Sequence, residues 1–248
     1  MSVKGLRAAR LPLRLAWLYA GLAGFGLSLA LLVQARLGLD PWDVLSQGIA
    51  RRTGIPIGWV VDIIGAFVLL AWIPLRQRPG IGTVSNVILV GIVLNAALGI
   101  IPAPAALAWR LPMLAAAIVL NAVATACYLG ARLGPGPRDG LMTGIVARGH
   151  SLRRVRTAIE LTVLVAGVAL GGSAGVGTVA YALAIGPLVH LLLPRLTLAE
   201  RALPAANRDA DPAPDLPAPD RNAPAAPGPA PTICAKRGAS PCHPFSSA

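Results

Sequence analysis

The sequence predicts an all-α integral membrane protein with six transmembrane helices. Its 248 residues are 55% hydrophobic and only 13% charged, with a mean hydropathy of +0.67. Soluble domains carry about 25% charged residues, so this deficit, together with long uncharged runs, is typical of membrane proteins. One stretch of the chain also occurs twice, which predicts two structural repeats.

The repeated stretch reads ARLGLDPWDVL at 35–45 and ARLGPGPRDGL at 131–141, at an offset of 96 (131 minus 35). A second match joins Gly-Ile-Gly-Thr at 80–83 to Gly-Val-Gly-Thr at 175–178, at an offset of 95 (175 minus 80). Each unit is therefore a span, a short Pro-x-Asp helix, a second span, Gly-x-Gly-Thr and a third span. Three spans are an odd number, so the second unit is predicted to be inverted relative to the first, as in many secondary transporters.

Each predicted span is an apolar run close to the roughly 20 residues that cross a bilayer core. The first run follows a basic start but is longer than the core of a signal peptide, so we expect it to be retained. The six runs lie at about 15–33, 55–75, 81–101, 111–130, 155–171 and 176–193. They form a membrane domain at 1–202, with repeat units at about 11–102 and 110–194. The segment at 203–248 is rich in Pro and Ala and lacks apolar bulk, so it is predicted to be a disordered tail.

Basic residues are distributed unevenly between the apolar runs. They concentrate in 1–14, 76–79, 132–156 and the segment after Arg195, whereas the alternate loops hold only Arg36, Arg51, Arg52 and Arg110. The positive-inside rule therefore predicts that both termini are cytoplasmic. The net charge of +12 is explained by this topology, and nucleic acid is not expected as a partner.

The two Pro-x-Asp elements are the first candidate site. Asp40-Pro41 is a helix N-cap followed by proline at the first helical position, so a short helix is predicted to run to about residue 50. If both short helices re-enter the membrane, Trp42, Asp43, Arg138 and Asp139 line a shared substrate cavity. The alternative is that Trp42 is an interfacial anchor and both aspartates cap surface helices.

Two acidic residues inside the predicted spans are the second candidate site. A charged side chain in a span costs about 2.5–3.5 kcal/mol on insertion scales, so Asp62 and Glu160 are proton or cation coupling candidates. Arg156 lies four residues before Glu160 on the same helix face, which predicts an ion pair. Asp62 has no such neighbour and is expected to face protein, water or another helix.

The sequence gives little support to an enzyme. It contains no phosphate-binding loop, no His-Glu-x-x-His motif and no Gly-x-Ser-x-Gly elbow. Its three cysteines form neither a disulfide framework nor a Cys-x-x-Cys site. We therefore expect no catalytic residues, no metal and no cofactor. The expected partners are the lipid bilayer and an unknown small solute or ion, while a second copy of the chain or a partner membrane protein is left open.

The motifs as a set resemble the YczE/YyaS/YitT group of bacterial integral membrane proteins. They are the two Ala-Arg-Leu-Gly copies with their Pro-x-Asp helices, the two Gly-x-Gly-Thr turns, and Val-Arg-Thr-Ala-Ile-Glu at 155–160. The resemblance covers about 11–194 and implies a multi-pass protein of the bacterial inner (plasma) membrane, with no established activity.

Two functions fit these observations. The inverted repeat and the buried acids favour a small secondary transporter or permease with its site between the two halves. The alternative is a membrane scaffold or regulator that acts on a partner protein and moves no solute.

Overall fold

The computed structural model describes residues 11–149 and 151–197, and all regular structure in this part of the chain is α-helical. The helices follow in the order α2 (Leu11–Ala35), α3 (Pro41–Thr53), α4 (Ile57–Leu75), α5 (Ile81–Ile100), α6 (Leu107–Gly130), α7 (Pro137–Val146), α8 (Leu152–Ala169) and α9 (Val176–Leu196). They cover the six predicted runs and both predicted short helices. The predicted tail lies outside the described residues.

The described helices include five that are long and apolar enough to cross a membrane: α2, α4, α5, α6 and α9. The helix at the fifth predicted run, α8, has 18 residues but carries three arginines and Glu160. Its composition alone therefore does not mark it as a span. Large apolar side chains such as Phe67, Ile73 and Leu183 are 66–72% exposed, as expected where a surface faces lipid.

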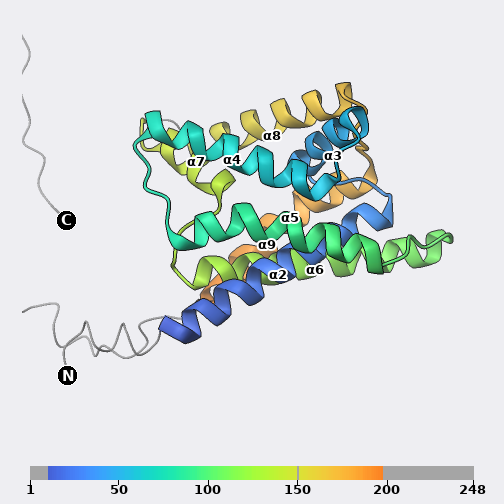
Figure 1. The fold of residues 1–248 in the computed structure, drawn as a ribbon, viewed down its shortest axis with the longest axis horizontal. Helices are drawn as coiled ribbons and strands as arrows, with labels where there is room; N and C mark the ends of the chain where they lie inside the picture. Colours follow the sequence, from blue (N-terminus) through green and yellow to red (C-terminus); the bar gives the residue numbers. More distant parts are fainter. Residues whose placement is uncertain (1–10, 150, 198–248) are drawn as a thin grey trace, which may run out of the picture. The chain divides into compact units, whose positions relative to one another are not determined.

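The helices lie in two layers (Figure 1). In one layer α2 packs along α6, with α5 against α2 and α9 against α6. The other layer holds the two short helices, with α3 against α8 and α7 against α4. The main described contact between the layers is made by α4 on α5. Each short helix therefore packs along a longer helix of the same layer.

Small residues let the backbones of the central pair, α2 and α6, approach closely. A Cβ added to Gly21 of α2 would lie 2.7 Å from the backbone nitrogen of Tyr128 on α6. On the other side of α2, a Cβ at Gly26 would lie 2.7 Å from the carbonyl oxygen of Val90 on α5. Close approach through small residues is a main source of helix association in membranes, where water does not drive it.

The repeated sequence motifs contact each other across the two halves. Gly177 of the second Gly-x-Gly-Thr turn donates its N–H to the carbonyl of Leu37, at 2.8 Å. Reciprocally, Gly82 of the first turn donates to the carbonyl of Leu133, at 2.9 Å. Each Ala-Arg-Leu-Gly stretch is thus held by the other half of the chain, which is why the two motifs occur as a pair in each half.

The glycine that ends each Ala-Arg-Leu-Gly stretch has a backbone that other residues rarely adopt. The φ angle is +121° at Gly38 and +129° at Gly134. A Cβ at either position would also lie 2.7–2.8 Å from the hydroxyl of Thr178 or Thr83 in the opposite turn. Both the conformation and the contact therefore require glycine.

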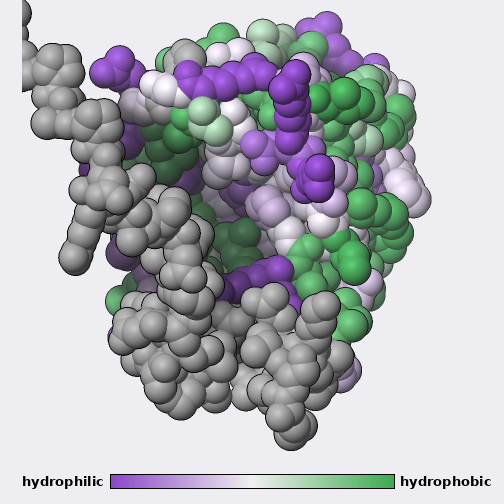
Figure 2. Space-filling model, turned by 90° about the vertical axis from the view of Figure 1, so that its left-hand side faces the viewer, coloured by the Kyte–Doolittle hydropathy of each residue, from purple (hydrophilic) through white to green (hydrophobic). Residues whose placement is uncertain are grey.

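The surface is hollowed at both ends of this arrangement. Figure 2 views the molecule from the left of Figure 1 and shows a hollow with hydrophilic residues on its rim. At the other end a pocket of about 400 Å³ lies beside the turn before α3. It is lined by Val33, Gln34, Arg36, Gly38, Leu39, Gln47, Arg51 and Ser173.

Candidate functional site

The first turns of the two short helices face each other at the centre of the molecule. Asp40 is the N-cap of α3, and its carboxylate accepts the backbone N–H of Asp43 at 2.6 Å. Proline occupies the first position of both helices, where the absent N–H costs no hydrogen bond. Gly136 is the N-cap of α7, so Arg138 and Asp139 lie in its first turn.

Arg138 joins the two short helices. Its guanidinium nitrogens lie 3.3 Å from Asp40 and 3.4 Å from Asp43, and both carboxylates are nearly buried. Its central carbon lies 5.1 Å from the centre of the Trp42 ring, within the range of a cation–π contact. Three of the four predicted cavity residues therefore meet directly, with Asp40 as an additional member that the sequence analysis interpreted only as a cap.

Asp139 lies beside this contact but is bound differently. Its carboxylate accepts a 2.8 Å hydrogen bond from the Tyr128 hydroxyl of α6. The fourth predicted residue therefore belongs to the same cluster, through a tyrosine that the sequence analysis did not identify.

Asp43 is completely buried and its charge is only partly balanced. It lies beside the like-charged carboxylate of Asp40, and the Arg138 guanidinium at 3.4 Å offsets this charge. One of its oxygens, Oδ2, has no hydrogen-bond partner among the described residues, and the same is true of the Trp42 indole nitrogen. An unpaired buried polar atom costs about 1–3 kcal/mol, so the site holds unused hydrogen-bonding capacity.

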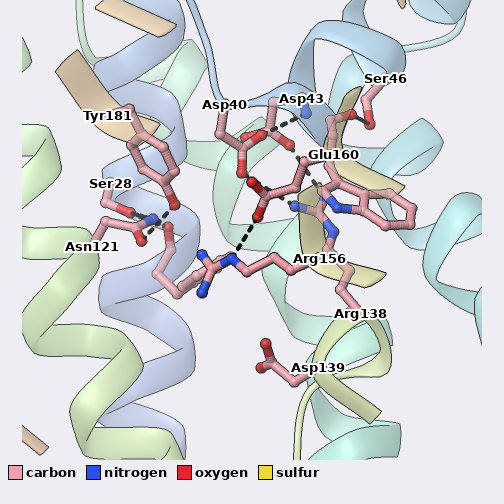
Figure 3. A network of polar contacts seen from close by, with 12 residues as sticks. Ser28, Asp40, Asp43, Ser46, Asn121, Arg138, Asp139, Arg156, Glu160 and Tyr181 are labelled. Atoms are coloured by element: carbon pink, nitrogen blue, oxygen red, sulfur yellow. Dashed lines mark hydrogen bonds and ion pairs between the residues drawn. The ribbon is translucent and has the colours of Figure 1, made fainter. Parts of the chain in front are cut away.

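The Arg156–Glu160 pair of α8 faces the same region. The predicted ion pair is present at 2.8 Å, and the side chains remain 49% and 28% exposed. Figure 3 shows this pair between the Arg138 contacts and a second polar group formed by Ser28, Asn121 and Tyr181. We call Asp40, Asp43, Arg138, Asp139, Arg156 and Glu160 the central cluster.

The second polar group joins α2, α6 and α9. Asn121 donates to the Ser28 hydroxyl at 2.8 Å and accepts from the Tyr181 hydroxyl at 3.0 Å. Asn121 therefore joins α6 to both α2 and α9. These polar groups lie within apolar helices. Their hydrogen bonds to one another lower the free-energy cost of burying them.

Asp62 does not join the central cluster. It accepts the backbone N–H of Gly91 at 2.9 Å, and the α4 and α5 backbones touch at Gly58 and Gly91. Glu160 and Asp62 are equivalent at an offset of 98 (160 minus 62), but Arg156 replaces Gly58 at that offset. Among the described residues α4 packs along α5, whereas α8 makes no contact of comparable extent with α9.

The described residues form no group of three or more His, Cys, Asp or Glu side chains suited to a metal ion. The central cluster instead combines four carboxyl groups with two guanidinium groups. Such a set binds by charge and hydrogen bonding, and its excess of carboxyl groups favours a cation.

Comparison with known proteins identifies the family. The model of a family of unknown function, DUF6198, matches residues 12–194. The chain belongs to this family. The resemblance to the YczE/YyaS group that the motifs indicated is therefore confirmed, and the matched range includes every residue of the central cluster.

Individual relatives agree with this assignment. An uncharacterized protein of Haemophilus influenzae is 43% identical over 169 residues, covering 68% of this chain and 78% of the relative. The uncharacterized membrane protein YczE of Bacillus subtilis is 33% identical over 189 residues, covering 75% and 87%. The uncharacterized protein YyaS of the same organism is 27% identical over 195 residues, covering 76% and 94%. No solved structure matches.

The family description names no activity. What the family and the helices together support is a multi-pass membrane protein.

Proposed function

We propose that this member of DUF6198 is a small secondary transporter whose substrate site lies between two inverted halves. The observation that carries the proposal is the buried contact of Arg138 with Asp40 and Asp43, because it joins the first turns of both short helices. Placing a charged side chain inside a membrane costs free energy, so such residues mark sites that contact a solute or an ion.

The lengths of the short helices fit a pair of half-helices that meet inside the bilayer. α3 has 13 residues and α7 has 10. At 1.5 Å per residue they are about 20 Å and 15 Å long, and a bilayer core is about 30 Å thick. Two half-helices placed end to end therefore reach across it, with their positive N-terminal ends at the centre. Asp40, Asp43 and Asp139 are acidic residues that such ends stabilise.

In this proposal α8 is the sixth span. Its 18 residues rise about 27 Å, and its first turns carry Arg153 and Arg154 on the cytoplasmic side. Both termini are then cytoplasmic, in the bacterial inner membrane. The reciprocal bonds of Gly82 and Gly177 to the opposite half support an inverted repeat, since each half makes the same contact on the other.

The two hollows provide routes to the site from opposite ends. The pocket of about 400 Å³ includes Gly38 and Leu39, which directly precede Asp40. The hollow at the opposite end lies on the face seen in Figure 2. A transporter needs access to its site from both sides in turn, so in this proposal each hollow is the start of one route.

Proton or cation coupling is assigned to the acidic residues of α4 and α8. Glu160 is partly exposed and its partner Arg156 lies close enough to Asp139 to influence its charge, so it is the better placed of the two. Asp62 is bound to the α5 backbone, and its second oxygen has no partner among the described residues.

Flux measurements test the proposal. The full chain is reconstituted in proteoliposomes that contain a pH-sensitive dye, and solutes are supplied by charge class. We expect solute-dependent proton movement in the wild type and its loss in Asp43→Asn, Asp139→Asn and Glu160→Gln. Asp209→Asn, in the tail sequence, is the matched control and should behave as wild type. If no solute moves in any preparation while the protein remains folded, the transporter is refuted and the scaffold alternative is favoured.

A further inference from the structure

The guanidinium of Arg138 occupies a place that has the features of an organic-cation site. It lies over the Trp42 ring at 5.1 Å and against the carboxylates of Asp40 and Asp43. An aromatic face beside carboxylates is the usual environment for an ammonium or guanidinium ligand. We call the Trp42 ring with these two carboxylates the Trp42 cage.

The contacts of Arg138 with the two carboxylates are longer than typical charge-assisted hydrogen bonds. Charge-assisted N–H···O bonds measure about 2.7–2.9 Å, whereas the two distances here are 3.3 Å and 3.4 Å. Each carboxylate receives a single nitrogen, so the paired geometry that favours arginine is absent. The Arg138 side chain is 20% exposed, compared with 6% for Asp40 and 1% for Asp43.

Two buried atoms of the cage have no partner. The Oδ2 atom of Asp43 and the indole nitrogen of Trp42 lack a hydrogen bond to any described residue, and both residues are more than nine-tenths buried. Arg138 therefore satisfies the cage only in part. In the other half, the equivalent Asp139 has its Oδ2 atom bonded to Tyr128. The Oδ2 atom without a hydrogen-bond partner is therefore that of Asp43, beside Trp42, and not that of the equivalent Asp139.

We propose that the Trp42 cage binds a small organic cation that carries N–H donors and one oxygen acceptor, and that Arg138 occupies the cage when this ligand is absent. The ligand's N–H groups bond both carboxylates, including the free oxygen of Asp43, and its oxygen accepts from the Trp42 indole. As the substrate class of the transporter, this inference depends on the proposed function, but binding to the cage can be tested separately.

Ethanolamine and choline form a matched pair of probes. Both have a cationic nitrogen and a hydroxyl, but choline has three methyl groups in place of the N–H donors. Calorimetric titration of the detergent-purified full chain should show at least tenfold tighter binding of ethanolamine than of choline. Equal affinities, or no binding of either, would overturn the proposal, since water alone would then satisfy the unpaired atoms.

Variants of Arg138 test whether it competes for the cage. Arg138→Gln removes the charge with little change in volume, and we expect ethanolamine to bind at least tenfold tighter than to wild type. Adding Asp43→Asn to this variant should abolish the gain. Arg78→Ala, at an exposed arginine in the α4–α5 turn, is the control. If Arg138→Gln does not fold, the comparison of ethanolamine with choline on the wild type decides the question.

The outcomes for the cage and for transport can be separated. Discriminating ethanolamine binding without flux in proteoliposomes would retain the cage and refute the transporter. Flux of another solute without ethanolamine binding would retain the transporter and refute the cage.

Discussion

The two equivalent glycines of α5 and α9 should respond differently to the same substitution. Gly91 and Gly186 are related by the repeat offset of 95 (186 minus 91). A Cβ at Gly91 would clash with the carbonyl oxygen of Gly58 and with the Asp62 carboxylate. A Cβ at Gly186 would meet no described atom within 4 Å. The difference arises because α4 packs against α5 at Gly91, whereas no described helix packs against α9 at Gly186.

The magnitude follows from these contacts. Gly91→Ala introduces overpacking of about 1–3 kcal/mol. It also disturbs the bond from Gly91 to Asp62, at about 1–3 kcal/mol, and gains about 1 kcal/mol of helix propensity. The net loss of stability is about 1–5 kcal/mol. At Gly186 the propensity gain is opposed by Pro187, the next residue, so the change stays within about 1 kcal/mol.

Unfolding in mixed detergent micelles, titrated with sodium dodecyl sulfate, measures both variants on the same scale. The expected result is a lower midpoint for Gly91→Ala and an unchanged midpoint for Gly186→Ala. Equal shifts in the two variants would refute the reasoning, because they would mean that both helix pairs are packed alike.

Two further predictions use other contacts. Gly38→Ala should destabilise the fold by about 2–4 kcal/mol, through its positive φ and its contact with a threonine of α9, while Gly99→Ala, in open space, should change it by less than about 1 kcal/mol in the same titration. Tyr128→Phe should lower the unfolding free energy by about 1–3 kcal/mol and by more than Asp139→Asn, which keeps an acceptor for the tyrosine; the reverse order would contradict this hydrogen bond.

Local signals in the sequence were sufficient to predict the short helix α3. The pair Asp40-Pro41 specifies a cap and a first helical residue, and the helix begins where this signal predicts. The interpretation of Trp42 as an interfacial anchor is wrong, because the ring is 7% exposed and covered by Arg138. A cap signal does not reveal that the same carboxylate also binds a guanidinium.

Long-range partners could not be predicted from the sequence. Arg138 is 98 residues from Asp40, and Tyr128 lies in an apolar run with nothing to distinguish it from a packing residue. By contrast, the different surroundings of Asp62 and Glu160 follow from the sequence once the repeat is aligned. Glycine at position 58 permits the close approach of α4 to α5, and the equivalent residue of α8 is Arg156.

Thiol labelling of position 43 tests most directly whether the central cluster is a transport site. Asp43→Cys is introduced in a chain whose three native cysteines are replaced by serine, and an impermeant reagent is applied to each side of oriented vesicles. Transport by alternating access predicts that the reagent labels position 43 from both sides of the membrane. Labelling that comes from one side only would contradict it.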